Sequence, residues 1–162
     1  MNLALDLDDV VIDFTAGILQ AAGVSSDRFK DIHSYDYREI FEFKPVWERV
    51  KDDTLFWLNL PPIEYIIPSV CTAYLTGRYA SEQITRSWLQ KWSLPQLPLY
   101  YSQDKARDGL ALGFTGVVDD KAKDFEACVK VLPDSFLVSR PWNRHAITPR
   151  RIFRLCELEW RT

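Results

Sequence analysis

The sequence predicts an α/β protein with a Rossmann-like parallel sheet, because short apolar segments alternate along the chain with segments of helical spacing. The chain has 162 residues, about the length of one domain and enough to bury a sizeable core. Hydrophobic residues make up 47% of it and charged residues 27%, which is typical of a globular protein and excludes a disordered or collagen-like chain.

Five short apolar runs are the predicted strands. Residues 3–5 end in a run of acids, and the β-prone residues 70–75 end at Thr76-Gly77. The other three runs are residues 99–101, 115–118 and 135–138. Because helices are expected between them, we expect these strands to pair in parallel.

Apolar residues at helical spacing, together with capping residues, give the expected helices. One helix begins at Thr15 and ends before Gly23, and Ser25 can cap a short helix that follows. The irregular aromatic spacing of residues 35–60 predicts several short helices. The remaining expected helices are residues 82–92, residues 125–131, and residues 149–160, where Thr148 is the cap and proline the first helical residue.

Charge, cysteine content and hydropathy narrow the kind of protein. The net charge is −3, so composition does not indicate nucleic-acid binding, although six arginines follow residue 139. Three cysteines without a C-x-x-C spacing fit reduced thiols better than a disulfide framework or a zinc site. No apolar run approaches the roughly 20 residues that span a bilayer, and the first residues lack a signal-peptide pattern. We therefore expect a cytoplasmic protein without a membrane segment.

Acidic side chains follow two of the predicted strands, and the carboxyl ends of parallel strands meet at one edge of a sheet. Asp6 and Asp8 point the same way in an extended segment, where two carboxylates repel unless a cation offsets them. Asp119 and Asp120 repeat the pattern after residues 115–118. Oxygen ligands of this kind suit Mg²⁺, so these strand ends predict one shared magnesium site.

Thr76 and Lys105 complete a set of residues suited to a phosphoryl group. Lys105 supplies a fixed positive charge, and the Thr76 hydroxyl and the Gly77 amide supply hydrogen-bond donors. Each residue alone is more simply explained as a solvated acidic loop, a loop hydroxyl or a surface lysine. All of them together, at the ends of parallel strands, predict phosphoryl-group chemistry.

Four segments, in the proper order, resemble the four sequence motifs of the haloacid dehalogenase superfamily. They are Asp6-Leu7-Asp8-Asp9-Val10-Val11, Leu75-Thr76-Gly77-Arg78, Ser102-Gln103-Asp104-Lys105 and Val117-Val118-Asp119-Asp120. The resemblance implies a Rossmann-like core with a small helical cap inserted after the first strand. The implied division is a core of residues 1–13 and 70–162 and a cap of residues 14–69.

Shorter segments resemble one family within that superfamily, the 5′(3′)-deoxyribonucleotidases. Phe14 matches a substrate-contacting phenylalanine of that family. The other similar segments are Trp47 with Phe56-Trp57 and Leu60-Pro61-Pro62, and the late stretch Ser139-Arg140-Pro141-Trp142-Asn143. The resemblance implies a nucleotide substrate contacted by Phe14 and Trp47. The alternative is that the aromatic residues of the cap form only its own hydrophobic core.

The superfamily resemblance implies a two-step phosphatase that uses Mg²⁺. Asp6 would be the nucleophile that becomes an aspartyl-phosphate, and Asp8 would protonate the leaving oxygen and then activate water. Mg²⁺ would be held by the Asp6 carboxylate, the Asp8 carbonyl and chiefly Asp120, with Asp119 as a neighbour or a water-mediated ligand. The phosphoryl group would be bound by Thr76, Gly77 and Lys105.

Two features depart from the superfamily pattern. Asp9 stands where glycine is usual. Aspartate tolerates a left-handed backbone, so the turn can form, but a negative charge is added beside the metal. The gap from Lys105 to Asp119 is also longer than expected, and we expect a loop with Gly109 and Gly113 to absorb it.

Three functions are compatible with these residues. The first is a Mg²⁺-dependent phosphomonoesterase for nucleoside monophosphates, with a small-molecule substrate as its partner. The second keeps the fold and changes the substrate to another phosphometabolite or a nucleic-acid 3′-phosphate. The tail arginines offer some support for it, although a solvated face of the last helix is the simpler explanation. The third is a non-catalytic phosphate or nucleotide sensor, against which the presence of both Asp6 and Asp8 argues. No residue pattern indicates the base, the sugar or the oligomeric state.

Overall fold

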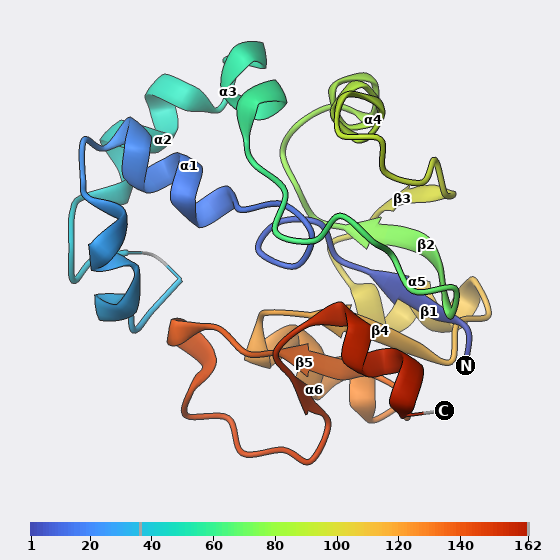
Figure 1. The fold of residues 1–162 in the computed structure, drawn as a ribbon. Coiled ribbons are helices and arrows are strands. Elements are labelled where there is room, and N and C mark those ends of the chain that lie inside the picture. The colour runs from blue at the N-terminus through green and yellow to red at the C-terminus, as the bar shows by residue number, and fades with distance from the viewer. Residues whose placement is uncertain (36, 162) are drawn as a thin grey trace.

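The computed structural model describes residues 1–35 and 37–161, which form a six-stranded parallel sheet with helices on both faces (Figure 1). Its strands are β1 (Leu3–Leu5), β2 (Cys71–Thr76), β3 (Leu99–Tyr101), β4 (Gly116–Asp119), β5 (Phe136–Val138) and β6 (Arg151–Ile152). Their order across the sheet is β3-β2-β1-β4-β5-β6. Successive strands are added on one side of β1 up to β3 and on its other side from β4 onward, so the strand order reverses between β1 and β4. In open α/β sheets, ligands bind outside the strand ends at such a reversal.

Helices connect most of these strands. The α-helices are α1 (Phe14–Ala21), α2 (Phe43–Val50), α3 (Thr54–Asn59), α4 (Glu82–Lys91), α5 (Lys105–Ala111) and α6 (Ala122–Val129). The 3₁₀ helices are η1 (Ser26–Asp31), η2 (Pro141–Asn143) and η3 (Leu155–Trp160). Between β1 and β2 the chain forms α1, η1, α2 and α3. In Figure 1, α1 and α2 lie beyond the end of β1 that leads into them. This places them on the side of the sheet where the strands end.

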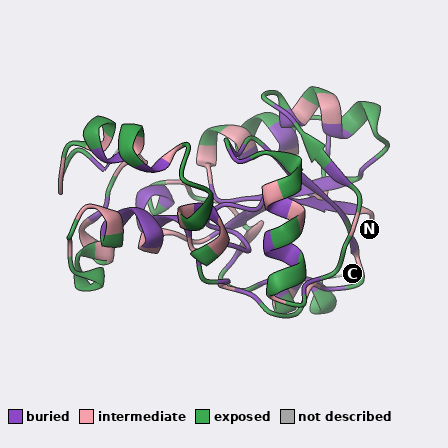
Figure 2. Ribbon diagram, turned by 90° about the horizontal axis from the view of Figure 1, so that it is seen from above, coloured by how far each residue is buried: buried purple, intermediate pink, exposed green. Residues whose placement is uncertain are grey.

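The sheet buries side chains on both faces, because successive residues of a strand point to opposite sides. In β1, Leu3 and Leu5 belong to a large cluster that includes Trp88 of α4. Ala4 belongs to a smaller cluster that includes Cys128 of α6. Figure 2 shows the burial concentrated along the strands. Burial on both faces explains why the sequence shows these strands as continuous apolar runs.

The segment between β1 and β2 is attached to the rest of the molecule through α4. The Trp88 Nε1 donates a hydrogen bond to the Leu60 carbonyl oxygen at 2.8 Å, and the Lys91 Nζ donates to the Leu58 carbonyl oxygen at 2.9 Å. Near the end of β1, Ile12 forms an isolated antiparallel bridge with Pro62. Among the described residues, no helix combines the length and hydropathy that crossing a bilayer requires.

The five predicted strands are confirmed, with bounds that differ by at most one residue at either end. The helix predicted over residues 149–160 is wrong. Instead, Arg151 and Ile152 pair in parallel with Leu137 and Val138, forming β6 at the sheet edge, and residues 155–160 form the 3₁₀ helix η3. Pairing with the exposed edge of β5 therefore overrides the local helix-start signal.

The loop expected with Gly109 and Gly113 is wrong at Gly109, because residues 105–111 form α5, whereas Gly113 lies in the turn after this helix with φ of 79°. The Asp104 carboxylate caps this helix by accepting a hydrogen bond from the Arg107 amide at 3.1 Å. Gly109 lies inside the helix, and a Cβ there would come within 3.0 Å of Leu132. The glycine therefore allows α5 to approach its neighbours rather than breaking the helix.

Candidate active site

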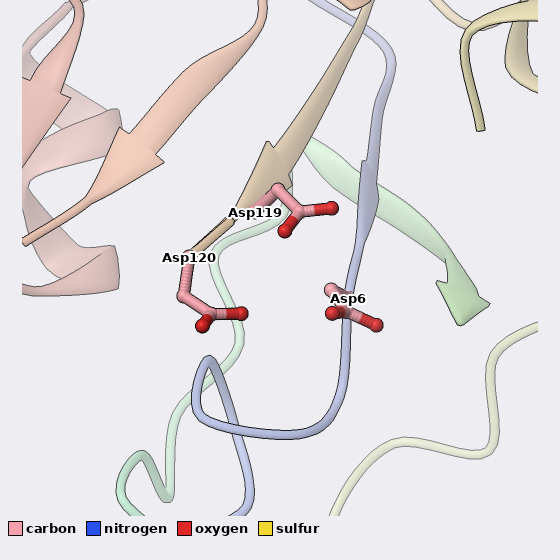
Figure 3. Close-up of side chains that lie close together, drawn as sticks. All are labelled: Asp6, Asp119 and Asp120. Atoms are coloured by element: carbon pink, nitrogen blue, oxygen red, sulfur yellow. The ribbon is translucent and has the colours of Figure 1, made fainter. Parts of the chain in front are cut away.

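Three acids from two neighbouring strands meet at the reversal of the sheet. Asp6 follows β1, and Asp119 and Asp120 lie at the end of β4 (Figure 3). The pairing of Leu5 with Val118 brings the two strand ends level. One carboxylate oxygen from each acid lies within 4.8 Å of the others, and all three residues are buried.

Lys105, the first residue of α5, joins two of these acids. Its Nζ lies 2.8 Å from Asp6 Oδ2 and 2.6 Å from Asp119 Oδ2. Burial by itself would raise the pKa of Asp6, but the positive charges of Lys105 and Lys121 outweigh it and lower that pKa. Burial raises the pKa of Asp119, although Lys105 opposes this effect. The surroundings of Asp6 therefore favour its ionised form.

Asp120 is held from the other side by η2. The Trp142 Nε1 donates to Asp120 Oδ2 at 2.8 Å, and the Asn143 Nδ2 donates to the Asp120 carbonyl oxygen at 2.7 Å. Burial and the neighbouring Asp119 raise the pKa of Asp120 well above its usual value. The sequence had shown Trp142 and Asn143 only as part of a similar segment, without this contact to Asp120.

The acids fit a divalent cation. Asp6 Oδ1 and Asp120 Oδ1 are buried and accept no hydrogen bond from any residue that the structure describes. Both Asp119 oxygens, in contrast, accept hydrogen bonds, from Lys105 Nζ and from the Lys121 amide at 2.8 Å. Two free oxygens on clustered, buried carboxylates are suitable ligands for a hard ion such as Mg²⁺. The hydrogen bonds of Asp119 favour an indirect role for it.

Asp8 lies beside Asp6 and faces a different partner. Its Oδ1 is 3.6 Å from the Arg78 Nε, which is longer than a hydrogen bond. Burial raises the pKa of Asp8, Arg78 opposes this, and the charge of Asp6 adds to the rise. The two carboxyl groups at this spacing thus differ, with the pKa lowered at Asp6 and raised at Asp8. Opposite shifts of two neighbouring carboxyl groups are typical of sites in which one acts as a carboxylate and the other as an acid.

Asp9 adopts the left-handed backbone that this turn requires, with φ of 59°. Its two carboxylate oxygens accept hydrogen bonds from the Thr15 amide and the Thr15 Oγ1, both at 2.9 Å. Burial raises the pKa of Asp9 to about 7. The carboxylate therefore faces the start of α1, and the turn forms without glycine, as the sequence predicts.

A cavity of about 490 Å³ opens onto these acids. Its wall includes six of the predicted site residues, namely Asp6, Asp8, Phe14, Trp47, Thr76 and Gly77. The wall does not include Lys105, Asp119 or Asp120. These residues lie next to Asp6, which is part of the wall. The remaining wall residues are Tyr35, Phe43, Trp57, Arg78, Tyr79, Gln103 and Lys121. Most of the sequence-predicted residues are thus gathered around one cavity and the acids below it.

Two cations in the cavity wall were not predicted as site residues. Arg78 is the last residue of the segment Leu75-Thr76-Gly77-Arg78 that the sequence analysis singled out, although no role was assigned to it, and Lys121 directly follows Asp120. The Lys121 Nζ lies 4.4 Å from the centre of the Tyr35 ring. Their position in the sequence, beside Gly77 and Asp120, was the signal that could have identified them as site residues.

The aromatic residues of the wall also pack on one another. The Phe14 ring stacks on the Trp57 ring with centroids 5.8 Å apart and meets the Trp47 ring edge-on at 6.4 Å. Phe14 and Trp57 are buried, while Trp47 is half-buried. The two roles considered for these residues, substrate contact and hydrophobic core, are therefore compatible for Phe14.

No protein-family model matches the sequence, and no curated protein matches it. Among solved structures, a crystal structure of an L-2-haloacid dehalogenase is similar. The two chains are 11% identical, the match covers 98% of this chain and 97% of the other, and the TM-score is 0.59. This likeness confirms the predicted fold class, an α/β protein with a Rossmann-type core like that of the haloacid dehalogenases.

Proposed function

We propose that this protein is a hydrolase that removes phosphate from phosphomonoesters through a covalent intermediate on Asp6. The observation that carries the proposal is the pair of carboxyl groups on the cavity wall. Asp6 is kept ionised by Lys105, and burial favours the protonated form of Asp8. A nucleophile and an acid at one cavity are what a two-step displacement at phosphorus needs.

In the first step, an Asp6 carboxylate oxygen forms a bond to phosphorus and the ester P–O bond breaks. The leaving alkoxide takes the proton of Asp8. In the second step, the Asp8 carboxylate accepts a proton from water as the water oxygen bonds to phosphorus, and the bond between phosphorus and Asp6 breaks. Inorganic phosphate leaves, and Asp6 is again a carboxylate. Thr76, Gly77 and Lys105 bind and neutralise the phosphoryl oxygens in this scheme.

The acids at the sheet reversal would hold Mg²⁺ through the Asp6 and Asp120 carboxylates and the Asp8 carbonyl oxygen, with Asp119 as a neighbour. The two buried carboxylate oxygens without hydrogen-bond partners support this assignment. Mg²⁺, when bound, supplies positive charge that stabilises negative charge on the phosphoryl oxygens. If these residues hold Mg²⁺, the wild-type protein should need the ion for activity, and the assay below measures that requirement.

Asp8 favours phosphate esters over the haloacids named for the similar structure. A halide leaves as a stable anion and needs no proton, whereas an alkoxide needs one. A buried carboxyl group beside Asp6 with a raised pKa therefore has a role as proton donor in ester cleavage and none in halide release.

For the substrate we propose a nucleoside monophosphate, with Phe14 and Trp47 contacting the nucleoside. The aromatic wall of the cavity supports this assignment, because aromatic faces stack on a planar base. Residues 14–69 would form a cap that excludes water and selects the substrate. The tail gives little support to a nucleic-acid 3′ end, since Arg151 and Arg161 both donate hydrogen bonds within the tail.

The test is phosphate release from a panel of nucleoside and sugar monophosphates, an aryl phosphate and 2-haloacids, with and without a chelator. The wild-type protein is expected to release phosphate only with Mg²⁺, and Asp6→Asn is expected to abolish release. Asp8→Asn is expected to slow turnover of the nucleotides by about 10²–10⁴-fold. Asp27→Asn, an exposed change on η1, is the matched control. Persistent activity of Asp6→Asn, or halide release in place of phosphate release, would contradict the proposal.

A further inference from the structure

Arg78 is a buried cation without a hydrogen-bonded partner for its side chain. Its side chain is fully buried in the cavity wall, directly after Thr76 and Gly77. Nε, Nη1 and Nη2 are all shielded from water, and none donates a hydrogen bond to the part of the chain that the structure describes. Asp8, 3.6 Å from Nε, is too far for a hydrogen bond.

The stacking of Arg78 on an aromatic ring explains how the guanidinium is held. Its central carbon lies 5.0 Å from the centre of the Trp57 ring, which also stacks on Phe14. A cation over an aromatic face is stabilised, but its five N–H donors still need acceptors. Leaving a buried charged group without hydrogen bonds is costly, so such groups in native proteins call for an explanation. A ligand oxyanion in the cavity would supply the missing acceptors.

The position of Arg78 relative to Asp8 indicates which part of a ligand it meets. This step rests on the proposed function, in which Asp8 gives its proton to the leaving oxygen. Arg78 is next to Asp8, so it lies on the side of the leaving group. The reacting phosphoryl group is assigned other partners, namely Thr76, Gly77 and Lys105. The planar guanidinium fork matches a phosphate or a carboxylate with two parallel hydrogen bonds.

We infer that Arg78 is a specificity-determining residue that binds a second oxyanion carried by the leaving group. This refines the substrate proposed above: a phosphomonoester with an additional phosphate or carboxylate, such as a nucleoside bisphosphate, is preferred over a nucleoside monophosphate, whose leaving group is a neutral alcohol. Because water does not reach the guanidinium, binding of the oxyanion requires a small shift of the Arg78 side chain or of Trp57. The guanidinium is already shielded from water and held against the Trp57 ring before a ligand binds. Binding therefore costs less conformational entropy and less desolvation at Arg78.

The test compares matched pairs of substrates in wild-type protein and in Arg78→Gln. Adenosine 3′,5′-bisphosphate against adenosine 5′-monophosphate tests a second phosphate, and 3-phosphoglycerate against glycerol 3-phosphate tests a carboxylate. In at least one pair, Arg78→Gln is expected to lower kcat/KM of the doubly anionic member at least about tenfold more than that of its partner. The pair that shows the difference identifies the oxyanion. Equal losses within both pairs overturn the inference, because an effect exerted only through Asp8 acts on all four compounds alike.

Two further variants guard against indirect effects. Arg86→Gln removes a positive charge from an exposed ion pair on α4, and no difference within a pair is expected. Arg78→Lys keeps the charge without the fork, and a smaller difference than for Arg78→Gln is expected. If Arg78→Gln does not fold, Arg78→Lys decides through the ratio of kcat/KM between the doubly anionic compound and its partner. A ratio equal to that of the wild type overturns the inference, and a reduced ratio upholds it.

Binding measurements separate this inference from the proposed function. If wild-type protein hydrolyses none of the four compounds, the phosphatase proposal fails, and calorimetric titration decides about Arg78 alone. An affinity for the doubly anionic member that falls at least about tenfold more than that of its partner in Arg78→Gln upholds the inference. Equal affinity changes overturn it. If the wild-type protein hydrolyses these compounds and Arg78→Gln leaves the ratio of kcat/KM within each pair unchanged, the inference fails while the proposed function stands.

Discussion

Replacement of Lys105 by methionine tests the charge balance of the buried acids. The Lys105 Nζ lies 2.8 Å from Asp6 and 2.6 Å from Asp119, and all three side chains are buried. Methionine keeps the apolar stem and removes the charge, so two buried carboxylates lose their counter-ion. Breaking a buried ion pair by removing one partner costs roughly 3–5 kcal/mol, because an uncompensated charge stays behind. We expect a loss of that size in the free energy of unfolding at about pH 7.

The pH dependence of this loss follows from the two carboxyl groups. Lys105 favours the ionised forms of Asp6 and Asp119, so its removal raises the pKa of both in the folded state. The folded protein then binds more protons than the unfolded chain above the ordinary carboxyl pKa, and its stability decreases as pH rises. The loss should therefore be smaller at about pH 5 than at about pH 7.

Urea unfolding of wild-type protein, Lys105→Met and the exposed control Lys44→Met at both pH values measures this difference. The control is expected to change stability by less than about 0.5 kcal/mol at either pH. A loss below about 1 kcal/mol at neutral pH, or an equal loss at both pH values, would refute the account of Lys105 as the counter-ion of these acids.

Three other predictions test separate parts of the structure. Trp142→Phe removes the hydrogen bond to Asp120, and calorimetry should show Mg²⁺ affinity reduced by about 10–100-fold; unchanged affinity would mean that Asp120 is not a ligand. Gly116→Ala places a Cβ 2.4 Å from the backbone of Asp134, so urea unfolding should show a loss of about 1–3 kcal/mol, and a neutral result would contradict that close approach. Burial raises the pKa of both buried thiols to about 12, so only the exposed Cys156 should react with a thiol reagent at neutral pH, and a second reacting cysteine would count against this packing.

The parts of the fold that the sequence predicts are those with a strong local pattern. β1, β2 and β4 stand out as apolar runs because they are largely buried on both faces. The acids after β1 and β4, and Gly77 after β2, indicate where these strands end. Parallel pairing then suffices to bring Asp6 and Asp120 together. The left-handed turn at Asp9 was also predictable, because aspartate adopts that conformation more readily than most residues.

The errors arise where tertiary contacts decide. The Thr148-Pro149 pair is a sound helix start, but β5 offers an open edge, and Arg151 and Ile152 pair with it instead. Gly109 suggested a loop, since no sequence rule shows that Leu132 will lie against that helix. Local signals cannot anticipate which sheet edge or which neighbouring side chain will be present.

Except for Lys121, which directly follows Asp120, the site residues that the sequence missed are distant from the acids in the chain. Trp142 and Asn143 reach Asp120 only because η2 follows β5, the neighbour of β4. Arg78 was visible beside Thr76, but its significance depends on burial and on the Trp57 ring beneath it. Sequence proximity identifies such residues as candidates, and only the packing shows what they contact.

The central claim is that Asp6 becomes covalently phosphorylated, and trapping of that intermediate tests it most directly. An aryl phosphate has a good leaving group and needs little help from an acid, so Asp8→Asn protein should form the intermediate and hydrolyse it slowly. After an acid quench, peptide mass spectrometry is expected to find one phosphoryl group on Asp6 and none in an Asp6→Asn, Asp8→Asn double variant. Phosphate release without a modified Asp6 at any time, or a phosphoryl group on another residue, would contradict the account.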